Sequence, residues 1–401
     1  MLSVLLFASQ VACDRWAVIY CGSRDFYNYR HTADSYYMHY LVRIENKLPK
    51  DRMILMCYDN IVDSPQNPFK GQIFRSLDHK NIYPGKDEIA YSGAATTAKN
   101  FYNVLLGDTS AGRALQSTEN DNVMVFFDNH GGDGILGVPE GCGPYIYAKD
   151  LKNVLQQMYE KKMYKNLFFP ITACYSGSVA KVVDGVPKLY MMTASNDHES
   201  SYACLYDSSL GTYLSSEFSV VSQLYWEANP TCTIGDSFEP IRTGVKQSHV
   251  CRYGDMSLEA LPVSDFLGLP NSVHRVRSIP AAAMIIKSSE TTARLSQLEV
   301  VGVKKNSFFQ ARIAAEVALE QEADKKVNAL ISGLKNKFTT DANFELPCAN
   351  INWDSYKLVL GHLQAKFDYL GESFYAKTRF FSNLCNVAPA EAIIKAIDSL
   401  L

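Results

Sequence analysis

The sequence lacks the features that mark several classes of protein. No two cysteines have the C-x-x-C spacing that is typical of zinc sites and of thioredoxin-like redox motifs. Ten cysteines in 401 residues are also too few for a disulfide scaffold, so each has to be considered singly. Basic residues do not exceed acidic ones (39 against 42, net charge −3), and we therefore expect no nucleic-acid partner.

Long apolar runs are missing as well. Beyond the N-terminus, no run reaches the roughly 20 residues that cross a bilayer, which predicts no membrane span. Residues 1–13 are mostly apolar and end at Cys13. We interpret them as a short secretory signal, with a buried first strand as the alternative. The single candidate for N-linked glycosylation, Asn229, is excluded by Pro230.

What is present is a globular composition, 47% hydrophobic and 20% charged, in a chain long enough for two or more domains. Continuous β-rich runs alternate with helical stretches over the first two-thirds. The β-rich runs lie at 16–21, 52–58, 123–128, 167–172 and 189–194, and the helical stretches around 35–47, 96–106 and 149–164. Strands without polar alternation are buried on both faces, so the pattern predicts an α/β fold, a mostly parallel sheet with helices on both faces.

The C-terminal quarter of the chain has a different pattern. From about residue 303 only helical periodicity remains, and this predicts a second, all-α domain. The stretch before it, about 255–302, mixes prolines, serines and charged residues, which is typical of an exposed connector.

Two predicted strands end in residues that can carry chemistry. The run 123–128 leads into His130, and 167–172 leads into Cys174. Consecutive strands of an α/β sheet are usually neighbours, so the two side chains can come within reach of each other. An imidazole can take the proton of a thiol, and the N–H groups of Gly131 and Cys174 could bind a developing oxyanion. The alternative is a loop histidine and an inert buried thiol.

A glycine motif in the same region fits a nucleotide site only in part. Gly132–Gly137 has the spacing G-x-G-x-x-G directly after a strand, but VPEGCGP follows where a dinucleotide site needs a helix N-terminus. We therefore expect no nucleotide, and more generally no cofactor and no metal.

Several ordered blocks resemble the legumain (asparaginyl endopeptidase) family. They are Asn28–His31 followed by Thr-Ala-Asp, the run ending His130-Gly131, Ala173–Ser178 and Glu199–Cys204, and the similarity covers nearly the whole chain. The resemblance implies a caspase-like sheet, a thiol peptidase that cleaves after asparagine in an acidic compartment, and a C-terminal inhibitory domain that is released by proteolysis in the connector.

Domain boundaries follow from this resemblance. It implies a signal peptide at 1–13, a caspase-like peptidase domain at 14–285, an activation connector at 286–302 and an all-α inhibitory pro-domain at 303–401. It also implies the secretory pathway as location: a lysosome-like acidic vesicle, the cell surface or the exterior. The partners are then protein or peptide substrates, and the pro-domain is an intramolecular inhibitor.

Residue roles carry over in the same way. The resemblance makes Cys174 the nucleophile that forms a thioester acyl-enzyme, His130 the base and acid, Asn28 a polar partner of the histidine, and Gly131 an oxyanion donor. The pocket for the substrate side chain before the cleaved bond (P1) would be lined by Arg30, His31, Thr172, Ser200, Ser201, Tyr202 and Ser216. A solvated charge at a helix start is the alternative for Arg30.

Two departures bear on specificity. Thr172 and Ser216 stand where the family has acidic residues that balance the pocket arginine and accept hydrogen bonds from the P1 amide. Their absence weakens the expectation of strict asparagine preference and leaves aspartate or a relaxed P1 residue open. Asn129 likewise replaces the family's aspartate before the histidine.

The pro-domain and connector leave questions open. The connector offers no asparagine for self-cleavage where the family alignment falls (288–292). Cys348 and Cys385, the cysteines of the predicted pro-domain, are a disulfide candidate by the family resemblance, with free thiols as the alternative. The predicted pro-domain and the rest of the chain differ little in net charge. We therefore expect that any release of the pro-domain by acid depends on local carboxylate contacts.

Two other functions remain possible from the sequence. One is a transamidase relative that acts on protein C-termini, a class that is held in membranes. The other is an inert α/β binding module in which Cys174 is merely packed. Labelling of Cys174 by a thiol reagent would separate the enzyme hypotheses from the inert module, in which Cys174 stays unlabelled.

Overall fold

The structure is a computed structural model that describes residues 14–270, 288–289, 307–338, 344, 346–348 and 350–401. The predicted signal peptide (1–13) and most of the predicted connector (286–302) therefore lie outside the described residues. Within the described part, no helix is both long and apolar enough to cross a membrane.

A seven-stranded sheet forms the centre of the molecule, in the order β12–β9–β8–β4–β1–β2–β3. Its strands are β1 (Arg15–Cys21), β2 (Met53–Met56), β3 (Ile89–Tyr91), β4 (Asn122–Asp128), β8 (Asn166–Thr172), β9 (Leu189–Thr193) and β12 (Cys251–Gly254). All neighbours are parallel except β12, which is antiparallel to β9. The predicted mostly parallel sheet is confirmed. The short edge strands β3 and β12 were not predicted, because three or four residues carry too little pattern.

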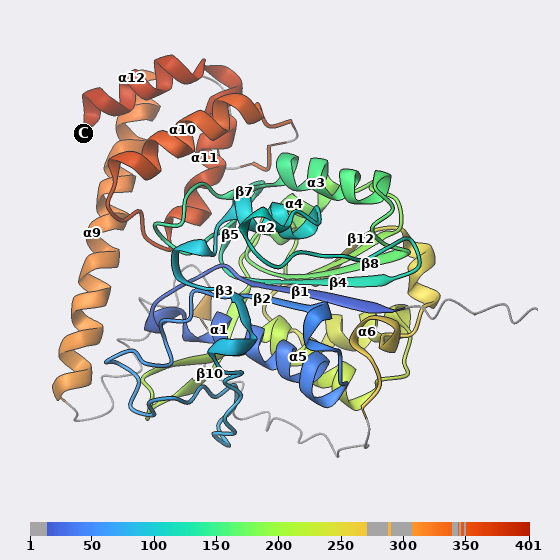
Figure 1. Ribbon diagram of the computed structural model, residues 1–401. Coiled ribbons are helices and arrows are strands. Elements are labelled where there is room, and N and C mark those ends of the chain that lie inside the picture. Colours follow the sequence, from blue (N-terminus) through green and yellow to red (C-terminus); the bar gives the residue numbers. More distant parts are fainter. Residues whose placement is uncertain (1–13, 271–287, 290–306, 339–343, 345, 349) are drawn as a thin grey trace, which may run out of the picture.

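Helices cover both faces of this sheet (Figure 1). Along β1, alternate side chains enter two separate cores: Ala17 and Ile19 pack with α1, α5 and α6, while Val18 and Tyr20 pack with α2, α3 and α4. The helices are α1 (Tyr29–His39, continued as a π-helix over Tyr40–Glu45), α2 (Ala98–Leu105), α3 (Ala148–Glu160), α4 (Ser176–Val183), α5 (Glu217–Ala228), α6 (Ile234–Gly244) and α7 (Ser264–Leu267). Short 3-10 turns occupy Phe26–Asn28, Lys50–Arg52, Lys86–Glu88, Gly93–Ala95, Thr109–Ala111 and Met256–Ala260.

Two small antiparallel sheets flank the large one. The first has the order β11 (Thr212–Ser216), β10 (Tyr202–Asp207), β13 (Ser288–Ser289), and the second joins β5 (Gly131–Gly132), β6 (Ile135–Leu136) and β7 (Ile146–Tyr147). The glycine motif thus forms the β5–β6 hairpin, with no helix N-terminus directly after it. The expectation of an exposed connector over about 255–302 is wrong for the first part of that stretch, because Phe266 and Leu267 of α7 are buried in the core. Further along, Ser288–Ser289 form β13 and pair with β10.

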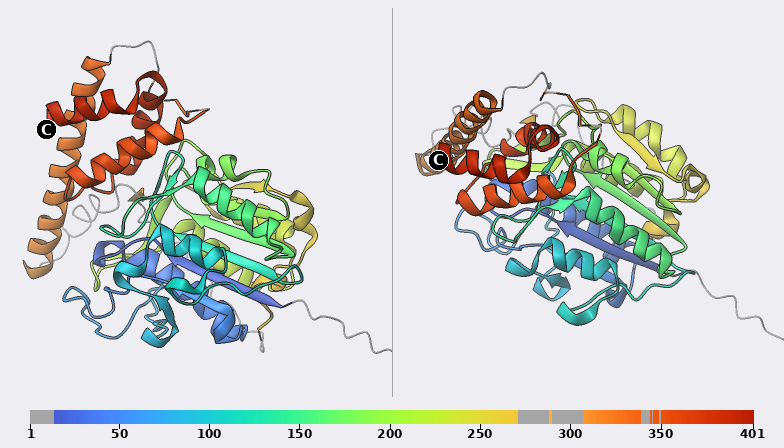
Figure 2. Two further views of the ribbon diagram at one scale, coloured as in Figure 1. Left: turned by 45° about the horizontal axis from the view of Figure 1, so that its top comes forward. Right: turned by 90° about the horizontal axis from the view of Figure 1, so that it is seen from above.

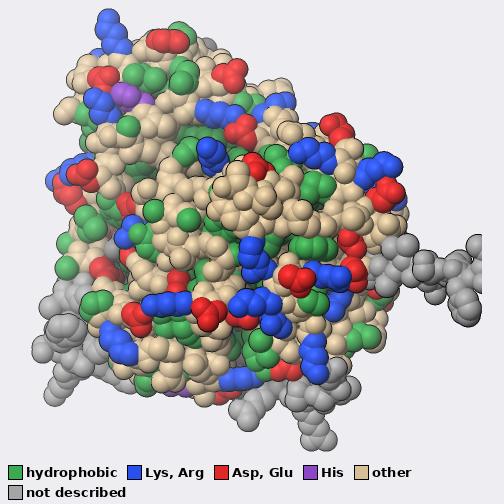
Figure 3. Space-filling view, viewed as in Figure 1, with side chains coloured by type: hydrophobic (Ala, Val, Ile, Leu, Met, Phe, Trp, Pro, Cys, Tyr) green, Lys and Arg blue, Asp and Glu red, His purple; other side chains and the backbone are tan. Residues whose placement is uncertain are grey.

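The C-terminal region is all-helical, as predicted. It contains α9 (Ser307–Lys337), α10 (Trp353–Lys366), α11 (Phe374–Val387) and α12 (Ala390–Leu400). The apolar core of these helices continues into the α/β part of the chain, which we call the body (residues 14–270). Ile135, Tyr145 and Tyr147 of the body belong to the same apolar cluster. The region lies against the end of the sheet at which the parallel strands terminate (Figures 1 and 2). On the face in Figure 3, acidic and basic side chains are interspersed, in line with the small net charge.

Candidate active site

The histidine and the cysteine predicted for the site leave adjacent parallel strands. Strands β4 and β8 pair with Asp128 opposite Thr172, and the Asn129 N–H donates to the Thr172 carbonyl at 3.1 Å. A Cβ added to Gly131 would lie 2.4 Å from the carbonyl oxygen of Cys174. The structure therefore brings the His130 loop against the Cys174 backbone, and this close approach requires glycine.

Cys174 lies buried at the turn between β8 and α4. The turn is sharp, since Tyr175 has a φ of 55° in the left-handed region. The Ser201 N–H donates to the Cys174 Sγ at 3.2 Å, and the Ser201 hydroxyl lies 3.6 Å away. Both an N–H donor and the positive end of α4 favour the thiolate over the thiol.

Hydrogen bonds define which nitrogen of His130 carries a proton. Its Nε2 lies 2.9 Å from the Asn28 Oδ1, and the Asn28 amide is oriented by donating from Nδ2 to the Arg24 carbonyl at 3.1 Å. An amide oxygen only accepts, so Nε2 is the donor and Nδ1 has the lone pair. Among the described residues, the buried Nδ1 has no hydrogen-bond partner. In the neutral imidazole, Nδ1 is therefore the nitrogen that is left to accept a proton.

Residues of the predicted P1 pocket come from three elements. Arg30 and His31 are fully buried in the first turn of α1, which excludes a solvated charge for Arg30. The His31 ring meets the His130 ring edge-on at 4.8 Å, and its Nδ1 lies 2.9 Å from the Ser23 hydroxyl. Thr172 and Ser216, at the ends of β8 and β11, are buried too.

The remaining pocket residues line the edge of β10. Ser201 is buried next to the Cys174 Sγ, while Ser200 and Tyr202 are half-buried. Strand β13 pairs with this edge, Ser289 opposite Tyr202 and Ser288 opposite Ala203. The edge beside the cysteine thus accepts an extended segment by backbone pairing, which is a common mode of peptide binding.

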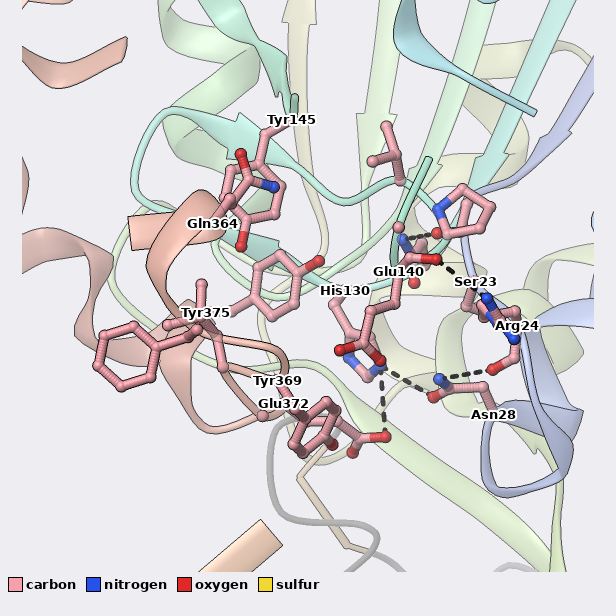
Figure 4. A pocket seen from close by; sticks show the side chains of 18 of the residues that line it. Ser23, Arg24, Asn28, His130, Glu140, Tyr145, Gln364, Tyr369, Glu372 and Tyr375 are labelled. Atoms are coloured by element: carbon pink, nitrogen blue, oxygen red, sulfur yellow. Dashed lines mark hydrogen bonds and ion pairs between the residues drawn. The ribbon is translucent and has the colours of Figure 1, made fainter. Parts of the chain in front are cut away.

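The C-terminal helices cover His130 directly. The ring of Tyr375 stacks on the imidazole at 5.3 Å, and the Glu372 Oε1 lies 3.6 Å from the His130 Nε2 (Figure 4). The cavity that remains has a volume of about 160 Å³ and is lined by both parts of the chain. Sequence reasoning missed Glu372 and Tyr375, which carry no motif. It also missed Asp34, a buried carboxylate that accepts a hydrogen bond from the Ser216 N–H at 2.7 Å. This residue belongs to the Thr-Ala-Asp block after His31.

A second contact joins α11 to the β5–β6 hairpin. Asp133 accepts a hydrogen bond from the Ser382 hydroxyl at 2.6 Å and lies 3.6 Å from the Arg379 guanidinium. Burial raises the pKa of Asp133, and these two partners only partly oppose that shift. The Arg379 guanidinium also donates to the Asp197 carbonyl, so one arginine connects α11 to two loops beside the site.

The predicted disulfide is not formed in the structure. Cys348 and Cys385 are both free thiols, and the Cys348 Sγ accepts a hydrogen bond from the Asn386 amide at 2.9 Å. Burial raises the pKa of Cys385 to about 12. The described residues also contain no group of three or more His, Cys, Asp or Glu side chains that could hold a metal ion.

The sheet is mostly parallel and has helices on both faces, and a histidine and a cysteine follow the ends of neighbouring strands. These features define a cysteine peptidase of caspase-like architecture. Residues 15–269 match the Peptidase C13 family, and the chain belongs to that family. It is 35% identical to legumain of Mus musculus over 411 residues, 96% of this chain and 92% of that protein. It is 34% identical to legumain of Homo sapiens (79% and 75% covered) and 27% identical to the vacuolar-processing enzyme of Vicia sativa (95% and 84%). The protein is a cysteine endopeptidase of the legumain type.

Proposed function

We propose that this peptidase works through a Cys174–His130 dyad. The Nδ1 of His130 takes the thiol proton, and the thiolate attacks the carbonyl carbon of the scissile bond. The N–H groups of Gly131 and Cys174 bind the oxyanion, and His130 passes the proton to the leaving amine. Water, deprotonated by His130, then hydrolyses the thioester and regenerates the thiol. The observation that carries this proposal is the 2.9 Å hydrogen bond between the Asn28 Oδ1 and the His130 Nε2, which leaves Nδ1 to accept the thiol proton.

Substrates are proteins or peptides that bind extended along β10. The P1 side chain enters a pocket made by the set Arg30, His31, Thr172, Ser200, Ser201, Tyr202 and Ser216. Asparagine is the residue expected from the family, with aspartate or a relaxed P1 residue as the alternatives. Asn28 acts as a positioning residue, because it contacts the histidine and not the substrate.

The chain is made as a zymogen under this proposal. The helical pro-domain (303–401) inhibits the peptidase domain (14–285), and Glu372 and Tyr375 occupy the space in front of His130. Acid pH and proteolysis in the connector (286–302) release the inhibitor. A signal peptide (1–13) directs the protein to the secretory pathway and then to an acidic vesicle, the cell surface or the exterior.

A peptidyl electrophile that alkylates an activated thiol tests the dyad. After acid activation, we expect labelling of the unmodified chain and loss of both labelling and peptide cleavage in Cys174→Ala and His130→Ala. Cys251→Ala is the matched control, since Cys251 is half-buried on β12 and outside the site. Labelling that persists in Cys174→Ala, or moves with Cys251, would refute the assignment.

A further inference from the structure

The guanidinium of Arg379 occupies a site that the body of the peptidase builds. Arg379 lies on α11, and only 8% of the residue is exposed. Its Nη2 lies 3.6 Å from the Asp133 Oδ1 and donates a hydrogen bond to the Asp197 carbonyl. The guanidinium carbon lies 5.3 Å from the centre of the Tyr175 ring, within the range of a cation–π contact. A carboxylate, a carbonyl and an aromatic face are groups that together bind an arginine side chain, and we call this set the arginine site.

Contacts within the body hold the two sides of the arginine site together. The Gly134 N–H donates to the Ser178 hydroxyl at 2.9 Å, and that hydroxyl donates to the Tyr175 carbonyl at 2.6 Å. The hairpin tip that carries Asp133 is thereby tied to the first turn of α4. Tyr175 directly follows Cys174, so the site adjoins the cysteine. We therefore expect the site to persist when the helical region is released.

Asp133 supplies the negative charge of the arginine site. Among the described residues, the hydrogen-bond and ion-pair partners of its carboxylate, Ser382 and Arg379, both lie on α11. The Asp197 carboxylate differs, because it pairs with Lys181 of the body. Release of the helices removes both partners of Asp133 and leaves its charge beside the cysteine. A buried carboxylate without a partner is unfavourable, so a basic side chain from a substrate would take the vacated place.

The direction of β13 indicates which part of a substrate reaches this site. Strand β13 is antiparallel to β10, so a peptide that pairs in the same direction passes Tyr202 and then Ser201. The Ser201 N–H contacts the Cys174 Sγ, so the cleaved bond lies at this level. The loop that contains Asp197 comes next along this edge. Residues that follow the cleaved bond therefore run toward the arginine site.

We propose that the arginine site binds a basic side chain of the substrate, preferably arginine, at the first or second position after the cleaved bond (P1′ or P2′), with Asp133 as the specificity-determining residue. Arginine is favoured over lysine because a planar guanidinium can lie on the Tyr175 ring while it pairs with the carboxylate. In the full-length chain, Arg379 fills the site in place of a substrate. The inference rests on the proposed peptidase mechanism and on release of the helical region.

Peptides that differ in one side chain test the arginine site. Quenched fluorescent substrates share one sequence up to P1, with Asn or Asp at P1, and carry Arg, Lys, Gln or Glu at P1′ or at P2′. The full-length protein is assayed after acid activation at pH 6, where free carboxylates are ionised. At one of the two positions we expect kcat/KM to fall in the order Arg, Lys, Gln, Glu. Arg should exceed Gln by about fivefold or more, as for a partly exposed charge-assisted contact.

Two variants change the charge of the site. Asp133→Asn keeps the shape of the side chain and should abolish the preference for Arg over Gln, and Asp133→Lys should reverse it in favour of Glu. Asp87→Asn, at an exposed position in the turn Lys86–Glu88, is the matched control for the loss of one acidic charge and should keep the preference. Each preference compares peptides within one variant, so differences in the extent of activation cancel.

Equal cleavage of the Arg and Gln peptides at both positions by the unmodified protein would overturn the inference and leave the peptidase function standing. A preference for Arg that persists in Asp133→Asn would overturn the role of Asp133. Cleavage of none of the peptides would count against the proposed mechanism itself, and the inference would fall with it. The comparison within the unmodified protein does not depend on the folding of any variant.

Discussion

At the scale of single residues, Asn28 decides how His130 can act. Its amide oxygen lies 2.9 Å from Nε2 and so places the lone pair on Nδ1. The histidine is further confined by the His31 ring on one side and the Tyr375 ring on another. Under the proposed dyad, a base that is held in one tautomer needs no reorganisation before it accepts the thiol proton.

Replacing Asn28 by alanine should therefore lower kcat by about 10²-fold, at the lower end of what general acid–base catalysis contributes. The KM should change little, because Asn28 does not contact the substrate. Steady-state kinetics after acid activation measure both constants. Asn153→Ala on the exposed face of α3 serves as the control, and a fall confined to KM would contradict the positioning role.

Gly131 makes a second residue-scale prediction. In Gly131→Ala the new Cβ would lie 2.4 Å from the Cys174 carbonyl oxygen, so the histidine loop must move. We expect loss of most activity and a loss of about 1–3 kcal/mol in the free energy of unfolding, the usual cost of overpacking. The matched control is Gly361→Ala in α10, where a Cβ meets nothing within 4 Å. Helix propensity should make that variant slightly more stable, by up to about 1 kcal/mol.

At the scale of elements, α11 and the loop before it close the site. Tyr375 stacks on His130, and its ring also packs edge-on against Tyr145 of the body. A Cβ on Gly137 would meet the Tyr375 hydroxyl at 2.6 Å, which shows how closely the helix approaches the hairpin.

Tyr375→Ala should weaken this cover and raise the activity of the full-length chain at pH 7 several-fold. The variant should also lose about 3–5 kcal/mol of stability in the helical region, as expected for removing a large buried aromatic ring. Turnover of a peptide substrate before activation is the measurement. Tyr159→Ala, 40% exposed on α3, is the control, and unchanged latency in Tyr375→Ala would argue against the cover.

The contact between α9 and α11 should respond to acid. Burial alone would raise the pKa of Asp324, but hydrogen bonds from Lys377 and the Ser373 hydroxyl outweigh burial and lower the pKa below its usual value. A carboxylate whose pKa is depressed by folding stabilises the fold above its ordinary pKa, near 3.8. That contribution disappears as the pH falls through the lowered pKa.

Asp324→Asn should accordingly destabilise the helical region at pH 7 by about 0.5 kcal/mol, the range for a partly exposed ion pair, and by less at pH 3. Thermal unfolding at the two pH values measures the difference. Glu322→Gln, which alters an exposed charge on the same helix, should give a smaller change at pH 7. An effect of Asp324→Asn that grows on acidification would contradict the sign of the pKa shift.

At the scale of the whole molecule, the helical region and the body share one apolar cluster. Ile135, Tyr145 and Tyr147 of the body pack with the cores of α9 to α12. Releasing the helices must expose these side chains to water. Under the proposed zymogen mechanism, removal of the pro-domain therefore lowers the stability of the body.

Removing residues 303–401 should raise turnover over that of the full chain and lower the melting temperature of the body. Adding the separate helical segment in trans should reduce turnover again if it binds the same surface. Equal turnover of the full and truncated chains would rule out intramolecular inhibition.

Local sequence determined much of this protein. Unbroken apolar runs had to become strands buried on both faces, and the 3.6-residue periodicity beyond residue 303 had to become helices, because neighbouring residues alone decide which faces are apolar. Since consecutive parallel strands usually pair, the positions of His130 and Cys174 directly after two such runs sufficed to bring the histidine loop against the Cys174 backbone.

Only the tertiary structure decided which contacts form between residues that are far apart in the sequence. The bond from Asn28 to His130, the approach of Glu372 and Tyr375, the engagement of Asp34 by β11 and the pairing of Ser288–Ser289 with β10 each join segments far apart in the chain. The absence of a Cys348–Cys385 bridge has the same origin, because disulfide formation depends on Sγ positions that spacing does not fix. The sequence placed a cysteine and a histidine directly after the carboxyl ends of two neighbouring strands. Only the packing of α1, β11 and α11 around them decided the hydrogen bond of His130, the contacts of Asp34 and the side chains that cover the histidine.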